Sequence, residues 1–83
     1  MGKKIVLPED TWIDVDSSRI KQINYDPDQR ILGIRFKRDR VYYYHPVTQE
    51  GYLIFQEAES VGKHFEEYIK NNDRLSVYED DSE

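Results

Sequence analysis

The sequence contains no cysteine, which excludes disulfide bonds and cysteine-ligated zinc and fits a reducing compartment. No apolar run approaches the roughly 18–20 residues that a membrane-spanning helix requires. The first ten residues contain one short apolar stretch, residues 5–7, which is too short for a signal peptide. We therefore expect a cytoplasmic protein with no membrane partner.

The chain is short and its charge is unevenly distributed. Its 83 residues suit one small domain, 13% of them are aromatic, and the formal net charge is −5. Residues 19–44 carry seven basic and three acidic side chains, whereas residues 45–83 carry three basic and ten acidic ones. A domain of this size buries a modest apolar core, so we expect a monomer or a weak homodimer. The basic middle segment is the part suited to an anionic partner.

The apolar pattern changes period near residue 46. Residues 20–25, 31–37 and 41–45 alternate as strands do, with turn residues between them, and Pro46 ends the third strand. Beyond residue 50 the apolar side chains recur every three or four residues, which indicates two short helices, the second capped by Ser60. The expected fold class is α+β: a small antiparallel meander of three or four strands, followed by two helices packed on one sheet face. We expect a flexible leader over 1–11, the domain over 12–75 and a disordered acidic tail over 76–83.

Three adjacent tyrosines, Tyr42 to Tyr44, make the register of the second hairpin decisive. A two-residue loop would place Tyr43 on the core face, whereas a three-residue loop over 37–39 would place Tyr42 and Tyr44 there. Asp39 tolerates the left-handed conformation that the longer loop needs, so we predict that loop. Tyr43 would then project into solvent on the outer sheet face. The predicted core is Ile23, Tyr25, Leu32, Ile34, Phe36, Tyr42, Tyr44, Tyr52, Phe55, Ala58, Phe65 and Ile69.

The outer sheet face is the candidate binding surface. An exposed ring among cations is how several RNA-binding modules hold single strands, and Gly33 would allow a base or a backbone to approach closely. The candidate nucleic-acid-binding residues are Lys21, Arg35, Lys37, Arg38, Arg40, Tyr43 and His45. The alternative reading is an ordinary solvated face of a one-sided sheet.

The sequence offers no convincing catalytic or metal-binding constellation. Ser17 and Ser18 have no paired base, so we interpret them as a structural brace for the segment before the first strand. His45 and His64 lack companions at ligand spacing, and we expect no metal or other cofactor. Trp12 suits a lid over the core, with a partner-binding anchor as the alternative.

Taken in order, several short motifs resemble the KTSC domain family, which is named for a C-terminal segment of some lysyl-tRNA synthetases. The motifs are "VDSSRIKQINYD" (15–26), an L-x-I-x-F strand from Leu32, the Y-x-Y of Tyr42 and Tyr44, "HPV" (45–47) and a Y-x-x-x-x-x-A-x-S-x-G-x-x-F-x-x-x-I run from Tyr52. Together they span roughly residues 13–75. The chain departs from the family pattern at Asp39, where glycine is common, and at Glu66, where asparagine is.

The resemblance implies an antiparallel meander followed by two helices, in small bacterial or phage proteins whose function is not established and for which RNA binding is a suggestion. We expect a noncatalytic module that binds RNA, tRNA or another single-stranded nucleic acid through the outer sheet face. The alternative is a protein-interaction adaptor that uses its acidic helical side or a sheet edge.

Overall fold

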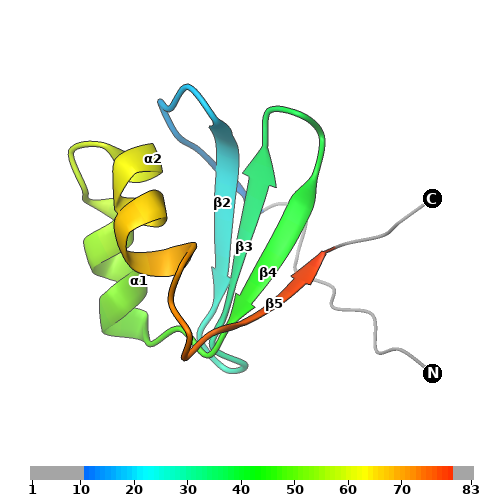
Figure 1. Cartoon of the computed structure of the whole chain (residues 1–83), viewed down its shortest axis with the longest axis vertical. Coiled ribbons are helices and arrows are strands. Elements are labelled where there is room, and N and C mark those ends of the chain that lie inside the picture. The colour runs from blue at the N-terminus through cyan, green and yellow to red at the C-terminus, as the bar shows by residue number, and fades with distance from the viewer. Residues whose placement is uncertain (1–10, 80–83) are drawn as a thin grey trace.

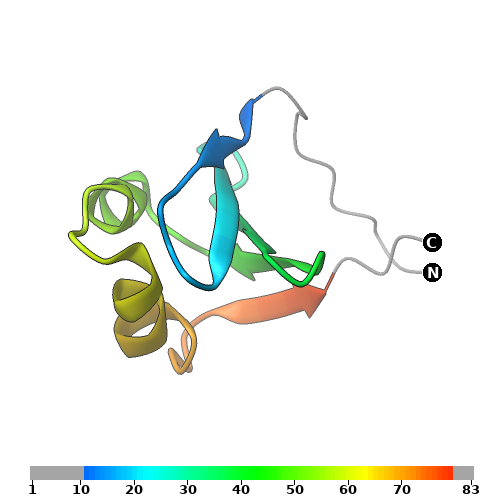
Figure 2. The same cartoon turned by 90° about the horizontal axis from the view of Figure 1, so that it is seen from above.

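A computed structural model describes residues 11–79, and these residues form one antiparallel sheet with helices on one of its faces (Figures 1 and 2). The sheet is a meander in the order β1-β2-β3-β4-β5. Its strands are β1 (Ile13–Asp14), β2 (Ile20–Asp26), β3 (Ile31–Phe36), β4 (Val41–His45) and β5 (Ser76–Glu79). Helix α1 (Gln49–Gln56), helix α2 (Val61–His64) and a π-helical turn η2 (Phe65–Ile69) lie between β4 and β5. The expected α+β meander with two helices is confirmed, but the sheet has five strands instead of three or four.

The last strand corrects the expected disordered tail at residues 76–79. All four residues of β5 are exposed, so side-chain burial does not order them. Pairing with β4 does: Tyr42 lies opposite Glu79 and Tyr44 opposite Val77. A side-chain pattern does not reveal β5, because backbone pairing with β4 holds this strand in place. Residues 80–83 of the expected tail, and residues 1–10 of the expected leader, lie outside the described residues.

The β3–β4 hairpin has the predicted three-residue loop. Leu32 lies opposite Tyr44 and Ile34 opposite Tyr42. Asp39 adopts the left-handed conformation with φ of 64°, and its N–H donates to the carbonyl of Phe36 at 3.0 Å. The short polar side chain of Asp39 tolerates this conformation. This loop sets the positions of Lys37, Arg38 and Arg40.

The helices cover the sheet face that carries Tyr44. Phe55 of α1 is fully buried, and Phe65 of η2 packs against both Phe36 and Tyr44. Of the predicted core, the residues that are buried in this cluster are Ile23, Leu32, Ile34, Tyr44, Tyr52, Phe55, Phe65 and Ile69. Tyr25, Phe36 and Tyr42 pack against it half-buried. Ala58 lies after the end of α1 and is half-buried, so its assignment to the core is wrong.

Three further residues, Ile20, Val47 and Val61, complete the core. Ile20 and Val61 stand at the first positions of β2 and α2, and Val47 stands between β4 and α1. Sequence periodicity identifies a face from several turns or residues of one element, so it does not detect single apolar side chains at element boundaries.

Tyr43 is buried, which contradicts the expectation that it projects into solvent. The register is as predicted, and Tyr43 faces away from Tyr42 and Tyr44, but only 6% of it is exposed. It forms a second small apolar cluster with Ile31 and Val41 on the outer face. Gly33, its partner across the strands, is buried as well. The expectation failed because it treated the outer face as bare, whereas this face carries packed side chains of its own.

Candidate nucleic-acid interface

Arg35, which was expected to meet nucleic acid on the outer face, is instead engaged within the protein. Its guanidinium lies 4.4 Å from the centre of the Trp12 ring, and its Nη1 donates to the side-chain oxygen of Gln22 at 2.6 Å. Gln22 in turn donates to Asp14 at 2.8 Å. Trp12 is half-buried and its ring packs against Arg35 on the outer face, so the expected lid over the helix-covered core is wrong. Tyr43 and Gly33 are buried at the centre of this face, and an exposed ring lies at its edge, where Tyr78 of β5 pairs with Tyr43.

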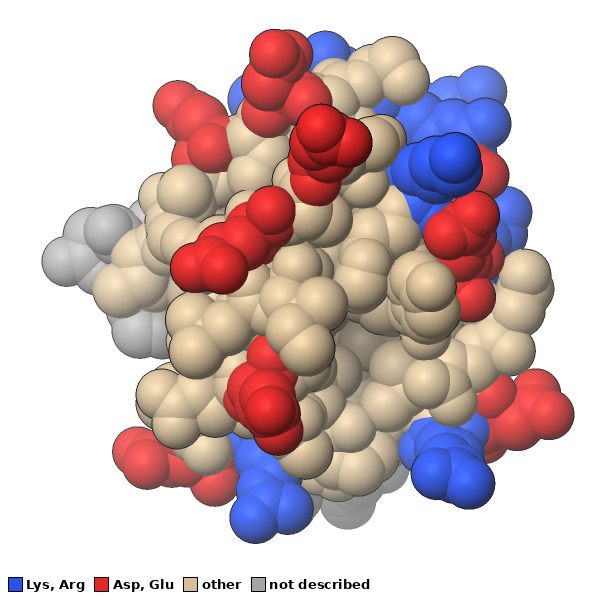
Figure 3. Space-filling view, turned by 90° about the vertical axis from the view of Figure 1, so that its left-hand side faces the viewer, with Lys and Arg blue, Asp and Glu red and all other residues tan. Residues whose placement is uncertain are grey.

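A groove on the opposite, helix-covered side of the sheet gathers five basic side chains. Lys37, Arg38 and Arg40 of the β3–β4 turn line one side, and Arg19 and Lys70 come from the start of β2 and the end of η2. All five side chains are exposed. The cavity is about 660 Å³. Figure 3 views the helix side, where acidic side chains are spread over the surface and the largest group of basic ones lies at the upper right.

Four aromatic rings form the floor of this groove. Phe36 packs edge to face with Tyr42 and with Phe65, at centroid distances of 5.6 and 5.4 Å. Tyr44 meets Phe65 at 5.6 Å in a similar T-shaped arrangement. Tyr44 and Phe65 are buried, whereas Phe36 and Tyr42 are half-buried. Aromatic pairs prefer this edge-to-face arrangement. The groove therefore has an apolar floor of packed rings, two of which are partly open to solvent.

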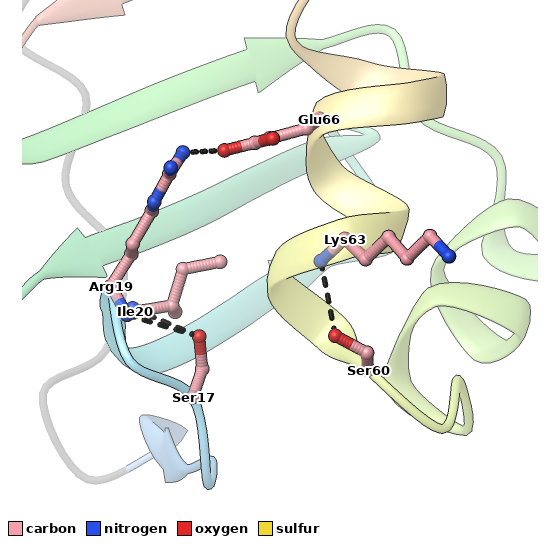
Figure 4. Close-up of polar contacts among 6 residues, drawn as sticks. All are labelled: Ser17, Arg19, Ile20, Ser60, Lys63 and Glu66. Atoms are coloured by element: carbon pink, nitrogen blue, oxygen red, sulfur yellow. Dashed lines mark hydrogen bonds and ion pairs between the residues drawn. The ribbon is translucent and has the colours of Figure 1, made fainter.

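Two carboxylates already face the cations of the groove. Glu66 of η2 forms an ion pair with Arg19, drawn in Figure 4, and Glu79 of β5 lies 3.0 Å from Arg40. The pKa of Arg40 is raised first by its contact with the Tyr42 hydroxyl and then by Glu79. Within residues 11–79, Lys37, Arg38 and Lys70 form no such ion pair. The groove keeps a net positive charge at the three cations that have no carboxylate partner in this region.

Ser17 anchors the segment that leads into this groove, and Ser18 takes no part in these contacts. Ser17 Oγ accepts hydrogen bonds from the backbone N–H groups of Arg19 and Ile20, each at 3.2 Å (Figure 4). A Cβ on Gly62 of α2 would come within 2.9 Å of that oxygen. Ser60 caps α2 by accepting from the N–H of Lys63 at 3.3 Å. Close packing of Ser17 on Gly62 thus holds Arg19 near η2. These contacts agree with the interpretation of Ser17 as a structural brace.

Burial raises the pKa of Tyr44 to about 12, with a smaller contribution from Tyr42. The hydroxyl of Tyr44 therefore stays neutral at any ordinary pH, and the charge of the groove comes from its basic side chains. Among residues 11–79 no three His, Asp or Glu side chains converge as a metal site requires.

Sequence reasoning found three of the five groove cations. Lys37, Arg38 and Arg40 line the groove, whereas Lys21, Arg35, Tyr43 and His45 are not among its lining residues. Arg19 belongs to the same basic segment, so the charge count could have included it. Lys70 lies in the acidic half of the chain and carries no signal in the sequence, because only the packing of η2 brings it to the sheet.

These features define the class of the protein: a small α+β domain in which an antiparallel meander, covered by helices on one face, carries a basic groove with an aromatic floor. Within the described part of the chain no helix is long and apolar enough to cross a bilayer. The family model of the KTSC domain matches residues 16–72. The chain therefore belongs to the KTSC domain family.

The chain is also similar to two bacterial proteins and to a solved structure. An uncharacterized protein of Stutzerimonas stutzeri is 34% identical over 58 residues, which is 70% of this chain and 82% of that protein. A protein of Tsukamurella paurometabola is 36% identical over 56 residues, or 68% of this chain and 84% of the relative. The crystal structure of a KTSC domain protein from Yersinia pestis superposes with a TM-score of 0.75 at 36% identity, covering 81% of this chain and 92% of that one.

Proposed function

We propose that this protein is a noncatalytic, cytoplasmic binding module that holds nucleic acid in the groove between the β3–β4 turn and η2. The observation that carries the proposal is the position of five exposed cations around partly open aromatic rings. Phosphates favour clustered arginine and lysine side chains, and bases stack on aromatic rings. The outer sheet face is no longer part of the proposal, because Tyr43 is buried there and Arg35 is engaged by Trp12 and Gln22.

The charge of the groove sets the expected character of binding. The whole chain carries a net charge of −5, which opposes phosphate binding over the rest of the surface. A ligand must also compete with Glu66 and Glu79 for Arg19 and Arg40. We therefore expect modest affinity at low salt. If three to five phosphates are contacted, the logarithm of the association constant should fall with that of the salt concentration with a slope of about −2 to −3.5.

Fluorescence anisotropy with tRNA and with a labelled single-stranded RNA tests the proposal. Arg38→Gln should weaken binding of every sequence and make the salt slope shallower by about 0.7–1. Arg74→Gln is the matched control, since Arg74 is exposed and does not line the groove. Absence of binding at low salt would reject the function, and equal losses in both variants would reject the groove as its location.

A protein partner is the second candidate, and one observation favours it. Leu53 and Ile54 of α1 and Tyr68 of η2 are 46%, 57% and 60% exposed, on elements of the helical side. Large exposed apolar side chains rimmed by charge are common at protein interfaces. A partner captured from nuclease-treated lysate by the wild-type chain, retained by Arg38→Gln and lost by Ile54→Glu, would favour an adaptor over nucleic-acid binding.

A further inference from the structure

The two open rings of the groove stand almost perpendicular to each other. The planes of Phe36 and Tyr42 make an angle of 85°. Tyr44 and Phe65, the other two rings of the floor, are only 4% and 6% exposed, so they offer little surface to a ligand. A flat ligand ring that stacks on one open ring therefore cannot stack on the other as well. This geometry has room for one stacked base, not for two bases sandwiched between parallel rings.

Tyr42 is the better placed of the two rings for a nucleotide. It lies opposite Glu79 of β5 and lines the groove together with Arg38 and Arg40. Arg40 lies across the turn from Phe36, whose N–H donates to the Arg40 carbonyl at 2.8 Å, and Arg38 lies within the turn. A base that lies on Tyr42 thus has cations beside it for its phosphate, and the cavity of about 660 Å³ falls in the size range of ligand pockets.

A double helix does not fit these requirements. Each base inside a duplex is covered on both faces by its neighbours, so it has no free face for Tyr42. Opening a base pair to expose one costs a few kcal/mol. An unpaired nucleotide has a free face at no such cost.

We propose that the groove selects single-stranded over double-stranded nucleic acid by stacking one unpaired base on Tyr42, with the flanking phosphates on Arg38 and Arg40. The inference rests on the proposed function and deepens it, since it states which form of nucleic acid the groove takes. Tyr42 is then the residue that discriminates between the two forms, and the cations supply the affinity that both forms share.

The test compares four fluorescein-labelled probes of equal phosphate number by anisotropy at low salt: single-stranded RNA, single-stranded DNA, an RNA duplex, and a single strand in which every nucleotide is abasic. Single-stranded RNA should bind about 5- to 150-fold more tightly than the abasic strand, the range that stacking of one base supplies. It should also bind more tightly than the duplex. Single-stranded DNA separates a general single-strand module, for which both strands bind alike, from one that also recognises the 2′-hydroxyl. Uridine monophosphate should compete only far above the oligonucleotide concentration.

Variants of Tyr42 locate the discrimination. Tyr42→Leu should reduce the preference for single-stranded RNA over the abasic strand. Tyr42→Phe should retain this preference because the aromatic ring remains. Tyr78→Leu is the matched control: Tyr78 lies on the neighbouring strand β5, is 49% exposed and does not line the groove. Thermal melts by circular dichroism verify that each variant is folded.

The outcomes separate the two proposals. If all four probes bind with equal affinity, or if uridine monophosphate competes as well as the oligonucleotide, the single-strand inference is wrong while nucleotide binding in the groove survives. If no probe binds, the proposed function itself fails. If Tyr42→Leu leaves the preference for single-stranded RNA over the abasic strand intact and Tyr78→Leu removes it, the stacking site lies on β5 and the role of Tyr42 is overturned.

Discussion

Gly62→Ala should destabilise the protein, although replacing a helical glycine by alanine normally stabilises by roughly 0.5–1 kcal/mol. The new Cβ would lie 2.9 Å from Ser17 Oγ, closer than such atoms pack. Moving that oxygen breaks its hydrogen bonds with the N–H groups of Arg19 and Ile20. Two hydrogen bonds at about 1 kcal/mol each outweigh the helical gain, which leaves a net loss of about 1 kcal/mol. The melting temperature should fall by about 4–8 °C.

A double-mutant cycle measured by thermal denaturation isolates this contact. In a Ser17→Ala background the oxygen is absent, so Gly62→Ala should become stabilising by roughly 0.5–1 kcal/mol. In a Ser18→Ala background the loss should persist, because the exposed neighbour Ser18 accepts neither of these hydrogen bonds. If Gly62→Ala is neutral or stabilising in the wild-type chain, or costs the same with and without Ser17, the brace does not exist as described.

Two further predictions concern Tyr44 and Arg30. The folded-state pKa of Tyr44, about 12, lies above its ordinary value of 10.0, so its contribution to stability is complete below pH 10 and is lost as pH rises toward 12. In urea titrations between pH 9 and 12, the free energy of unfolding of the wild-type protein should fall by up to about 2–3 kcal/mol more than that of Tyr44→Phe. If the free energies of the two proteins change in parallel with pH, burial does not hold the proton on Tyr44. Arg30 has a left-handed φ of 57° in the β2–β3 turn. Arg30→Gly should raise the melting temperature by roughly 2–4 °C, since relief of the backbone strain exceeds the entropy that glycine adds to the unfolded chain. A melting temperature lowered by Arg30→Gly would contradict this.

The sequence was sufficient for those parts of the fold that depend on local chemistry. Alternation within residues 31–36, the left-handed tolerance of Asp39 and the capping hydroxyl of Ser60 each act over a few residues, and the hairpin register and the start of α2 followed from them. Strand β5 was missed because its order comes from backbone pairing with β4, which leaves no mark on side-chain pattern.

The site was harder to predict because it depends on which residues cover each face. Because side chains alternate along a strand, Tyr43 was correctly predicted to face away from Tyr42 and Tyr44. This alternation does not tell whether other side chains cover the outer face. Tyr42 was assigned to the core but is only half-buried, because its burial depends on how far the helices extend over the sheet. Lys70 reaches the groove only through the packing of η2. The burial of these tyrosines and the position of Lys70 depend on tertiary packing, which local sequence patterns do not reveal.

We expect the ligand to occupy the groove and to leave the outer face of the sheet free. A titration of isotope-labelled protein with single-stranded RNA, followed through backbone and side-chain N–H resonances, distinguishes the two surfaces. We predict that shifts concentrate at Arg19, Lys37, Arg38, Arg40, Tyr42 and Lys70, while the indole N–H of Trp12 and the backbone of Tyr78 stay in place. Shifts centred on Trp12, Arg35 and Tyr78, with the groove resonances unchanged, would show that the ligand binds the outer face instead.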